Sequence, residues 1–425
     1  MSSVICKRRV MVIALSLVIC HLSFTGAVAQ SSEAVFKQQM QDYGIHFTND
    51  NKVTLLMSGQ AKFDDMFAHI RQAKESVHLE YFNFRNDSIA SLLFDILREK
   101  RREGVEIRAL FDGFGNDSNN QPLKHYHLKA LRDDSINIYE YDPIRFPWVT
   151  HIWPRDHRKI VVIDGRIAYT GGMNVADYYI KGTEQVGSWR DMHCRIEGSA
   201  VSDLQHIFCR IWQKVTGEDI LKPRYFHPQA AGNVTVGIAN REPGEVVTSN
   251  GYTVGRNDAM RKLYVSAIDA ARDSLKLINP YFVLVPSVKH ALERAIARGV
   301  NVQIMVSAKS DVPLTPDVVF YTVHKLMKRG AHVWLYKPGF HHSKILMVDG
   351  TFCTVGSANL DARSMRFDYE DNAIILNRDI TQQLDDMFDR DKLDSFYLTH
   401  DSWNEFRTSW QKFRGWFGHL FRPFL

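Results

Sequence analysis

Residues 341–361 read HHSKILMVDGTFCTVGSANLD, and the interpretation of the whole chain starts from them. A histidine and a lysine stand two residues apart, an apolar run follows, and Asp349-Gly350 then forms a pair that favours a tight hairpin turn. Residues 157–174, HRKIVVIDGRIAYTGGMN, repeat this pattern. One copy would fit a strand that carries a solvated lysine, whereas two matched copies are difficult to explain by packing alone.

Each copy is predicted to place a histidine and a lysine on one face of a strand, because side chains two residues apart point the same way. His157 and Lys159 form this pair in the first copy, and His342 and Lys344 form it in the second. A lysine offers positive charge to phosphate oxygens, and a histidine can act as nucleophile or general acid near neutral pH. His341 has the opposite parity to His342 and is not expected to catalyse.

Three further positions recur in both copies or beside them. Asp164 and Asp349 follow the histidines by seven residues (164 − 157 and 349 − 342), so their parity places them at the hairpin turn. Asn174 and Asn359 follow by 17 residues (174 − 157 and 359 − 342). We expect these asparagines, together with Ser357, to bind the phosphoryl oxygens where negative charge develops.

The two copies together can perform a reaction that one copy cannot. One histidine would attack phosphorus, and the other would protonate the leaving alcohol and later deprotonate the incoming one. Either histidine could be the nucleophile. The two lysines and two asparagines would stabilise the phosphoryl charge, so we expect no metal and no other cofactor.

An internal duplication explains why the pattern occurs twice. The order strand, helix, strand, helix, strand is found in both halves, which predicts an α/β fold. Gly104 and Gly299 end equivalent helices 195 residues apart (299 − 104), but the motif histidines are 185 apart (342 − 157). The first half therefore carries ten extra residues (195 − 185) within residues 144–156, IRFPWVTHIWPRD, which we expect at the rim of the site. Residues 30–222 and 233–395 are the predicted domains.

The two ends of the chain have a different character. Basic residues 7–9, an apolar run at residues 10–24 and Ala27-Val28-Ala29 predict a signal peptide or an uncleaved membrane anchor over residues 1–29. Residues 30–51 are expected to form a loosely packed lead-in. Residues 396–425 form an aromatic and basic amphipathic tail, which suits either a membrane surface with anionic lipid or a helix docked on the catalytic domains.

Composition restricts the class of protein. The chain has 425 residues, of which 45% are hydrophobic and 24% charged, as in soluble globular proteins of more than one domain. The net charge of +5 allows an anionic partner. The sequence has no concentrated basic stripe with interleaved stacking residues, so we expect no binding of nucleic acid. The five cysteines show neither metal spacing nor a disulfide framework.

The repeated motif resembles that of the phospholipase D superfamily, HxKxxxxD followed by G[GS]xN, and the chain is most similar to the bacterial cardiolipin synthases within it. The resemblance covers about residues 54–394 and includes Asp112-Gly113-Phe114-Gly115, Trp189-Arg190-Asp191 and residues 356–364, GSANLDARS. It implies two tandem phospholipase D-like domains, each a mixed sheet flanked by helices, with the active site at their interface.

The resemblance also implies roles for individual residues. The catalytic set would be the two complete motifs: His157, Lys159, Asp164, His342, Lys344 and Asp349. An acidic residue after each motif would orient its histidine, and Asp191 and Glu370 occupy those positions.

The implied reaction transfers a phosphatidyl group from one phosphatidylglycerol to the hydroxyl of another, which gives cardiolipin and glycerol. One phosphodiester replaces another, so no nucleotide activation is needed. The alternatives are a phospholipase D that hydrolyses phospholipids and a secreted metal-independent nuclease. The expected partners are anionic phospholipid, namely phosphatidylglycerol, and a membrane surface, on the extracytoplasmic side of the bacterial cytoplasmic membrane.

Overall fold

The computed structural model describes residues 31–144, 153–249, 252–312 and 315–421. The predicted leader, residues 1–29, and the middle of the predicted insertion, with Phe146 and Trp148, lie outside these residues. Within the described part of the chain, no helix is long and apolar enough to cross a membrane.

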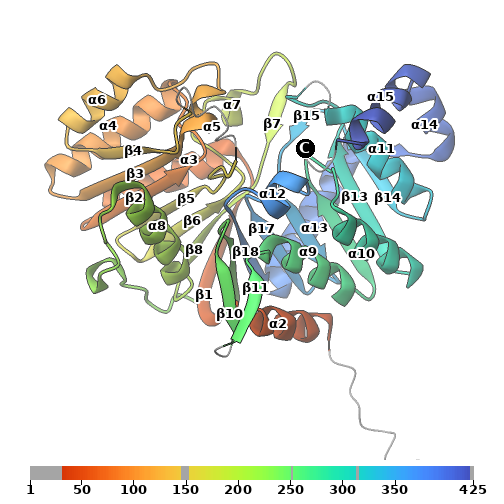
Figure 1. Ribbon diagram of the computed structural model, residues 1–425, viewed down its shortest axis with the longest axis horizontal. Coiled ribbons are helices and arrows are strands. Elements are labelled where there is room, and N and C mark those ends of the chain that lie inside the picture. Colours follow the sequence, from red (N-terminus) through yellow and green to blue (C-terminus); the bar gives the residue numbers. More distant parts are fainter. Residues whose placement is uncertain (1–30, 145–152, 250–251, 313–314, 422–425) are drawn as a thin grey trace, which may run out of the picture.

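One sheet of 15 strands runs through both halves of the molecule (Figure 1). From its outer edge inward, the first half contributes β4 (Asn137–Tyr141), β3 (Glu106–Asp112), β2 (Ser76–Tyr81), β5 (Ile160–Ile163), β6 (Ile167–Gly171), β8 (His193–Glu197) and β1 (Phe47–Leu56). From the centre outward, the second half contributes β9 (Val234–Arg241), β18 (Glu370–Leu376), β17 (Phe352–Gly356), β16 (Ile345–Val348), β12 (Ser274–Ile278), β13 (Asn301–Ser307), β14 (His332–Tyr336) and β19 (Ser395–Leu398).

The two halves share one topology, which confirms the predicted α/β duplication. In the first half β2 pairs in parallel with β3 and antiparallel with β5, and β3 pairs in parallel with β4. In the second half β12 has the same relation to β13 and β16, and β13 to β14. Each half is therefore a mixed sheet, and the antiparallel pair β1–β9 joins the two at the centre.

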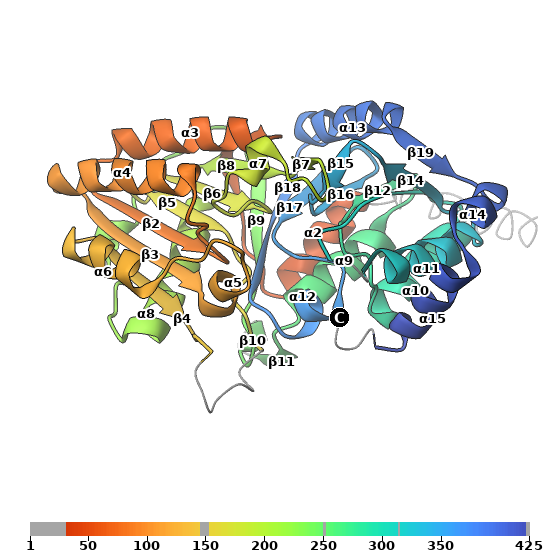
Figure 2. The same ribbon diagram turned by 90° about the horizontal axis from the view of Figure 1, so that it is seen from above.

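Helices cover the sheet on both faces (Figure 2). Those of the first half are α3 (Gly59–Gln72), α4 (Ser88–Arg102), α5 (Gly113–Asp117), α6 (His125–Asp133), α7 (Tyr178–Lys181) and α8 (Val201–Thr216), and η1 (Pro223–Tyr225) follows them. The others are α2 (Ser32–Asp42), α9 (Ala259–Ala270), α10 (Pro286–Ala297), α11 (Thr315–Met327), α12 (Ala362–Arg366), α13 (Arg378–Leu393), α14 (His400–Phe406) and α15 (Ser409–His419). Short two-stranded pairs are formed by β7 (Ser188–Arg190) with β15 (Gly339–His341), and by β10 (Val246–Ser249) with β11 (Tyr252–Arg256).

The strand that follows each motif histidine is buried on both faces. In β5, Ile160 and Val162 lie in a core cluster that includes residues of α8 and α13 and reaches Met347 of β16. Val161 and Ile163 lie in a second cluster with residues of α3 and α4. Burial on both faces explains why these strands are continuous apolar runs and not alternating patterns. The shared cluster also fixes the two halves against each other.

Residues 30–51 do not form the loosely packed lead-in that the sequence predicted. Helix α2 begins after Ser31, whose side chain accepts a hydrogen bond from the N–H of Ala34. Phe36 and Met40, four residues apart, are buried in the core of the second half, and Phe36 stacks on Phe352 with 4.4 Å between ring centroids. Two apolar residues on one helical face therefore anchor an otherwise polar segment.

The predicted tail is docked on the second half, which was one of its two expected arrangements. β19 pairs with β14 at the edge of the sheet, and α15 packs against α11. Gly415 permits this close approach, because a Cβ atom there would lie 2.4 Å from the carbonyl oxygen of Asp317. The outer surface of α15 nevertheless leaves aromatic side chains exposed, and Trp410 is 63% exposed.

Candidate active site

The aspartate of each motif lies at the hairpin turn, as strand parity predicts. Asp164 and Asp349 have φ of 52° and 51°, a left-handed conformation that aspartate tolerates better than most residues. The carboxylate of Asp164 accepts hydrogen bonds of 2.8 to 2.9 Å from the backbone N–H groups of residues 74–76. That of Asp349 accepts bonds of 2.8 to 3.0 Å from residues 272–274. Both tie the hairpin to the start of a neighbouring strand, so the structure gives them a positioning role instead of the catalytic one implied by resemblance.

The histidine and lysine of each motif precede a strand and do not lie in it, which corrects the prediction. β5 begins at Ile160 and β16 begins at Ile345. The segment before β16 forms β15, which pairs in parallel with β7 of the first half. The segment before β5 makes an equivalent parallel bridge between Asp156 and Tyr369. The backbone leaves the sheet at these points because it pairs with the other half.

These crossing segments fix the position of both histidines. The N–H of His342 donates to the carbonyl of Arg190 at 2.6 Å, and the N–H of His157 donates to the carbonyl of Tyr369 at 3.1 Å. In each case the accepting residue directly precedes an acidic residue of the other half. Each motif therefore makes a backbone hydrogen bond to the other half, and these two bonds bring the motifs together.

Each histidine is paired with the acid of the opposite half. Nδ1 of His157 lies 3.0 and 3.2 Å from the two carboxylate oxygens of Glu370. Nδ1 of His342 lies 2.7 Å from Oδ2 of Asp191. Both acids are almost completely buried. A carboxylate at Nδ1 fixes the tautomer and the ring orientation, so Nε2 is the nitrogen left for chemistry at phosphorus.

Burial lowers the pKa of both imidazoles. The pKa of His157 falls well below its usual value because the ring is desolvated, and the charges of Lys159 and Lys344 lower it further. Desolvation and Lys344 also lower the pKa of His342, but Asp191 opposes that change. Both rings are consequently neutral in the free enzyme near neutral pH, and a neutral imidazole has the lone pair that a nucleophile needs.

The two motif lysines are buried beside the histidines. Burial lowers the pKa of Lys159 to about 7 and that of Lys344 to about 8. Nζ of Lys344 lies 2.9 and 3.0 Å from the ring nitrogens of His342 and donates to its carbonyl at 2.6 Å. Lys159 makes the equivalent bond to the carbonyl of His157. A phosphate group that entered the site would favour the charged form of both lysines.

The two predicted asparagines are nearly buried next to the motifs. Asn174 and Asn359 are 5% and 6% exposed. Oδ1 of Asn174 accepts a long hydrogen bond of 3.4 Å from the N–H of Asn83. Oδ1 of Asn359 has no hydrogen-bond partner among the residues that the structure describes. Buried amides with unused hydrogen-bonding capacity are candidates for contacts with a substrate.

Ser357 occupies a different place from the one predicted. It is fully buried, and its hydroxyl donates to Glu370, so it supports the carboxylate that holds His157 and is not open to substrate. Ser364 donates to the other oxygen of Glu370 at 2.6 Å. Burial raises the pKa of Glu370, whereas Lys159 and these two hydroxyl groups lower it. Ser357 therefore acts on His157 through Glu370.

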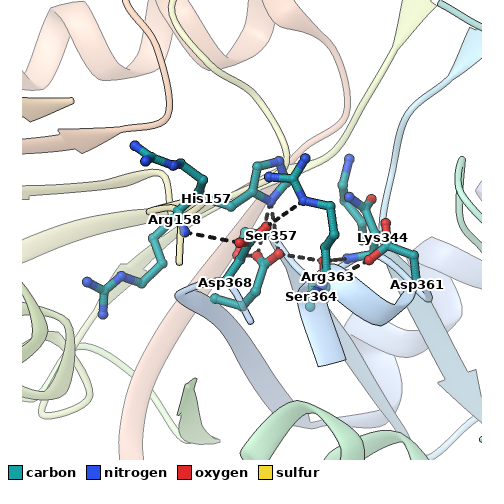
Figure 3. Close-up of polar contacts among 12 residues, drawn as sticks. His157, Arg158, Lys344, Ser357, Asp361, Arg363, Ser364 and Asp368 are labelled. Carbon is teal, nitrogen blue, oxygen red and sulfur yellow. Dashed lines mark hydrogen bonds and ion pairs between the residues drawn. The ribbon is translucent and has the colours of Figure 1, made fainter. Parts of the chain in front are cut away.

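Arg363 is a site residue to which the sequence assigned no role. It projects from α12, and its Nε donates to Oδ2 of Asp368 at 3.1 Å (Figure 3). Its charge also contributes to the low pKa of His157. The only signal in the sequence was its place in the stretch GSANLDARS. That Arg363 projects from α12 toward the site can be seen only in the folded structure.

Aromatic rings that the sequence did not assign to the site line the histidines. Phe82 packs edge-on against His157 with 5.1 Å between ring centroids. Trp189 and Tyr281 lie 5.5 and 6.0 Å from His342. Phe82 and Tyr281 both follow the first parallel strand of their half, at the edge of the sheet where α/β proteins place functional residues. Apolar walls of this kind exclude water from the reacting groups.

Two other sequence predictions concern the surroundings of the site. From the inserted segment the structure describes Trp153, which is 38% exposed and stacks on Phe367 with 5.6 Å between ring centroids. Phe367 directly follows α12.

Among the described residues, no group of three or more histidine, cysteine, aspartate or glutamate side chains is arranged to hold a metal ion.

Comparison with known proteins identifies close relatives. The family described as "Cardiolipin synthase, PLD-like domain" matches residues 66–212 and 264–392. The chain is 32% identical to a cardiolipin synthase of Oceanobacillus iheyensis over 89% of this chain and 76% of the relative. It is 31% identical to a cardiolipin synthase of Listeria welshimeri over 90% of this chain and 77% of the relative. Among solved structures, the phosphatidylserine synthase of Haemophilus influenzae superimposes with a TM-score of 0.69 over 92% of this chain and all of that chain. At 14% identity this likeness concerns the fold alone.

Proposed function

Because the chain belongs to the cardiolipin synthase family with phospholipase D-like domains and is a phosphatidyltransferase, we propose that it makes cardiolipin from two molecules of phosphatidylglycerol. The observation that carries this proposal is the crossed pairing of His157 with Glu370 and of His342 with Asp191. It supplies two oriented imidazoles in one site, which is what a double displacement at phosphorus requires.

In the first step, Nε2 of His157 attacks the phosphorus of a bound phosphatidylglycerol. Binding of the anionic phosphodiester beside His342 favours the protonated form of that ring. The bond between phosphorus and the headgroup oxygen then breaks, and glycerol leaves with the proton of His342, which becomes neutral. We assign the nucleophile to His157 because desolvation and the charges of Lys159 and Lys344 all favour its neutral form. His342 is the better acid because Asp191, at 2.7 Å, favours its protonated form.

In the second step, the phosphatidyl group passes from His157 to the hydroxyl of a second phosphatidylglycerol. His342 takes the proton of that hydroxyl, a new phosphorus–oxygen bond forms and the phosphorus–nitrogen bond breaks. Water in place of the lipid would give phosphatidic acid, so the aromatic walls formed by Phe82, Trp189 and Tyr281 favour transfer by limiting access of water.

The lysines and asparagines bind the phosphoryl oxygens in both steps. Lys159 and Lys344 provide charge from buried positions, where an electrostatic interaction is stronger than in water. Asn174 and Asn359 provide neutral hydrogen-bonding groups beside them. In this proposal no metal ion is needed to neutralise the phosphodiester.

Helix α15 is proposed to hold the enzyme on the membrane that contains its substrate. The exposed apolar side chains of this helix and the residues after it are Trp410, Phe413, Trp416, Phe417, Leu420 and Phe421. Lys412 lies among them and suits anionic lipid, whereas Arg414 is paired with the buried Asp317 of α11. Figure 2 shows α15 toward the same edge of the molecule as α5 and α12, which adjoin the site. We also propose that the enzyme acts on the extracytoplasmic side of the membrane, which the leader sequence over residues 1–29 supports.

The function is tested by incubating purified protein with vesicles of phosphatidylglycerol in the presence of a chelator and identifying the products by mass spectrometry. Cardiolipin and glycerol are expected. Phosphatidic acid as the main product would assign hydrolysis instead, and cleavage of DNA without turnover of lipid would contradict the proposal. His157→Ala and His342→Ala should each lower turnover by a factor on the order of 10³ or more.

A further inference from the structure

A cavity of about 430 Å³ lies next to the active site and takes no part in the steps described above. It is open to solvent and is lined by the first turns of α9 and α10 and by the end of α12, which are neighbours in both Figure 1 and Figure 2. Its polar lining consists of Arg241, Arg261, Arg366, Asp258, Asn257 and Ser287.

The cavity carries an excess of positive charge. Arg261 is paired with Asp258, the one acidic residue of its lining, and Asp258 also accepts a hydrogen bond of 2.8 Å from the hydroxyl of Tyr43. Arg366 is exposed to solvent. Arg241 is only 5% exposed; its Nη1 donates to the carbonyl of Asp368 at 2.9 Å and its Nη2 to the carbonyl of Arg366, whereas its Nε has no hydrogen-bond partner among the described residues. A buried guanidinium with an unused donor is costly unless an anion accepts from it.

Helix α10 adds to this preference for an anion. It has 12 residues and starts with Pro286 next to Ser287 on the wall of the cavity. Val285, at its N-cap, makes no side-chain hydrogen bond to the first turn. The N–H groups and the dipole of this turn therefore favour a negatively charged ligand, in addition to the three arginines.

The cavity and the catalytic centre lie against the same short helix. Arg366 of α12 lines the cavity, while Arg363 contacts Asp368 and Ser364 supports Glu370 in the site. Arg363 and Arg366 are three residues apart, or ~4.5 Å along the helix axis. Arg241 belongs to β9, where it is the register partner of Glu370. An anion in the cavity would thus contact Arg241, whose register partner on the neighbouring strand is Glu370, the acid that orients His157.

We propose that this cavity binds the phosphodiester group of the acceptor lipid, an anionic glycerophospholipid whose headgroup carries a free hydroxyl. The inference rests on the proposed function. With its phosphate held by Arg241, Arg261 and Arg366, the acceptor extends its three-carbon headgroup past α12 to the phosphatidyl group on His157. The hydroxyl oxygen then forms the new bond to phosphorus and gives its proton to His342. The cavity selects an anionic lipid over water or a small alcohol as acceptor.

The test is a competition between acceptors in the wild-type protein and the double variant Arg261→Gln/Arg366→Gln. Vesicles of phosphatidylglycerol are supplied together with ethanol, and the ratio of cardiolipin to phosphatidylethanol is measured. Ethanol has no phosphate, so loss of the arginines should lower the ratio about tenfold, the effect of losing a charge-assisted contact. Arg329→Gln, which removes an exposed, ion-paired arginine that does not line the cavity, is the matched control and should keep the wild-type ratio.

The outcomes separate this inference from the proposed function. A wild-type protein that makes neither cardiolipin nor phosphatidylethanol contradicts the function itself. A wild-type protein that makes both, with an unchanged ratio in the double variant, overturns the acceptor site. The cavity could instead bind free phosphate. In that case, adding inorganic phosphate at constant ionic strength changes the product ratio of the wild-type protein, whereas without added phosphate the double variant has the same product ratio as the wild type. That result also overturns the assignment to the acceptor lipid.

Discussion

At the scale of single residues, the site is a pair of imidazoles whose properties are controlled by groups from the opposite half. Glu370 and Asp191 determine which nitrogen of each histidine faces the substrate, and burial determines that both rings are neutral before substrate binds. Two serine hydroxyls donate to Glu370, whereas Asp191 accepts from the backbone N–H of Met192 at 2.7 Å. The two halves of the site are similar in plan but not equivalent in electrostatics.

This difference predicts which histidine carries the intermediate. With a phosphatidyl donor that has p-nitrophenol as its leaving group, no general acid is needed for the first step. His342→Ala should then accumulate a phosphatidyl-enzyme, detectable by intact-protein mass spectrometry, whereas His157→Ala should not. Accumulation in His157→Ala alone would reverse the assigned roles, and wild-type protein under the same conditions is the reference.

The lowered lysine pKa values predict loss of activity at alkaline pH. A lysine loses its charge above its pKa, and burial lowers the values for Lys159 and Lys344 to about 7 and about 8. In the free enzyme, kcat/KM should therefore fall as pH rises through this range. Lys159→Arg keeps a charge at every accessible pH, so its profile should lose the lower of these two transitions even if its maximal rate is reduced. An unchanged profile would contradict a role for the charge on Lys159.

At the scale of elements, each motif depends on a hairpin turn that is tied to a neighbouring strand. The carboxylate of Asp349 accepts hydrogen bonds from three successive backbone N–H groups, two through Oδ1 and one through Oδ2. The strand after His342 is held at its far end in this way, so the aspartate acts on the histidine through four residues of buried strand.

Substitution of Asp349 should lower stability in a graded manner. Asp349→Asn keeps one acceptor oxygen and tolerates positive φ, so the free energy of unfolding should fall by ~1 kcal/mol. Asp349→Ala loses all three bonds and should cost ~2–3 kcal/mol, measured by urea unfolding. Asp386→Ala, which removes an exposed carboxylate that contacts Gln382, should stay within ~0.5 kcal/mol. Equal effects of Asn and Ala would contradict this role.

Helix α15 is the element that we expect to bind lipid. Trp410, Phe413 and Phe417 are 63%, 48% and 49% exposed, and their rings stack in a row along the helix. Trp410→Ser/Phe417→Ser should weaken binding to phosphatidylglycerol vesicles at least tenfold in a flotation assay, because each ring buries apolar area in the interface. Tyr126→Ser, which removes an exposed ring of α6, should bind like wild type. Equal binding by the double variant would show that α15 is only a docked helix.

At the scale of the whole molecule, one sheet and one shared core make the two halves a single catalytic unit. β1 pairs with β9 at the centre, and a core cluster with residues of α8 and α13 combines side chains of both halves. Helix α2 adds to this connection, since it precedes the first half in sequence but packs in the core of the second. Each histidine therefore receives its acid from the same chain.

This architecture predicts that two defective chains do not complement each other. A mixture of His157→Ala and His342→Ala proteins should remain as inactive as either variant alone, because a complete site needs both histidines in one chain. Product formation from phosphatidylglycerol measures this directly. Recovery of activity in the mixture, after co-refolding or co-expression, would show that halves from different chains form a site.

The sequence by itself determined the duplicated α/β fold and the family, because the motif residues, their spacing and the strand–helix order are local features that repeat. It also placed Asp164 and Asp349 at turns, since strand parity depends only on neighbouring residues. Only the tertiary structure decided that Glu370 holds His157 and Asp191 holds His342, that Ser357 lies beneath the acid, and that Arg241 and Arg366 share a cavity. These contacts join residues that are far apart in the chain, and their partners depend on how the two halves of the sheet are brought together.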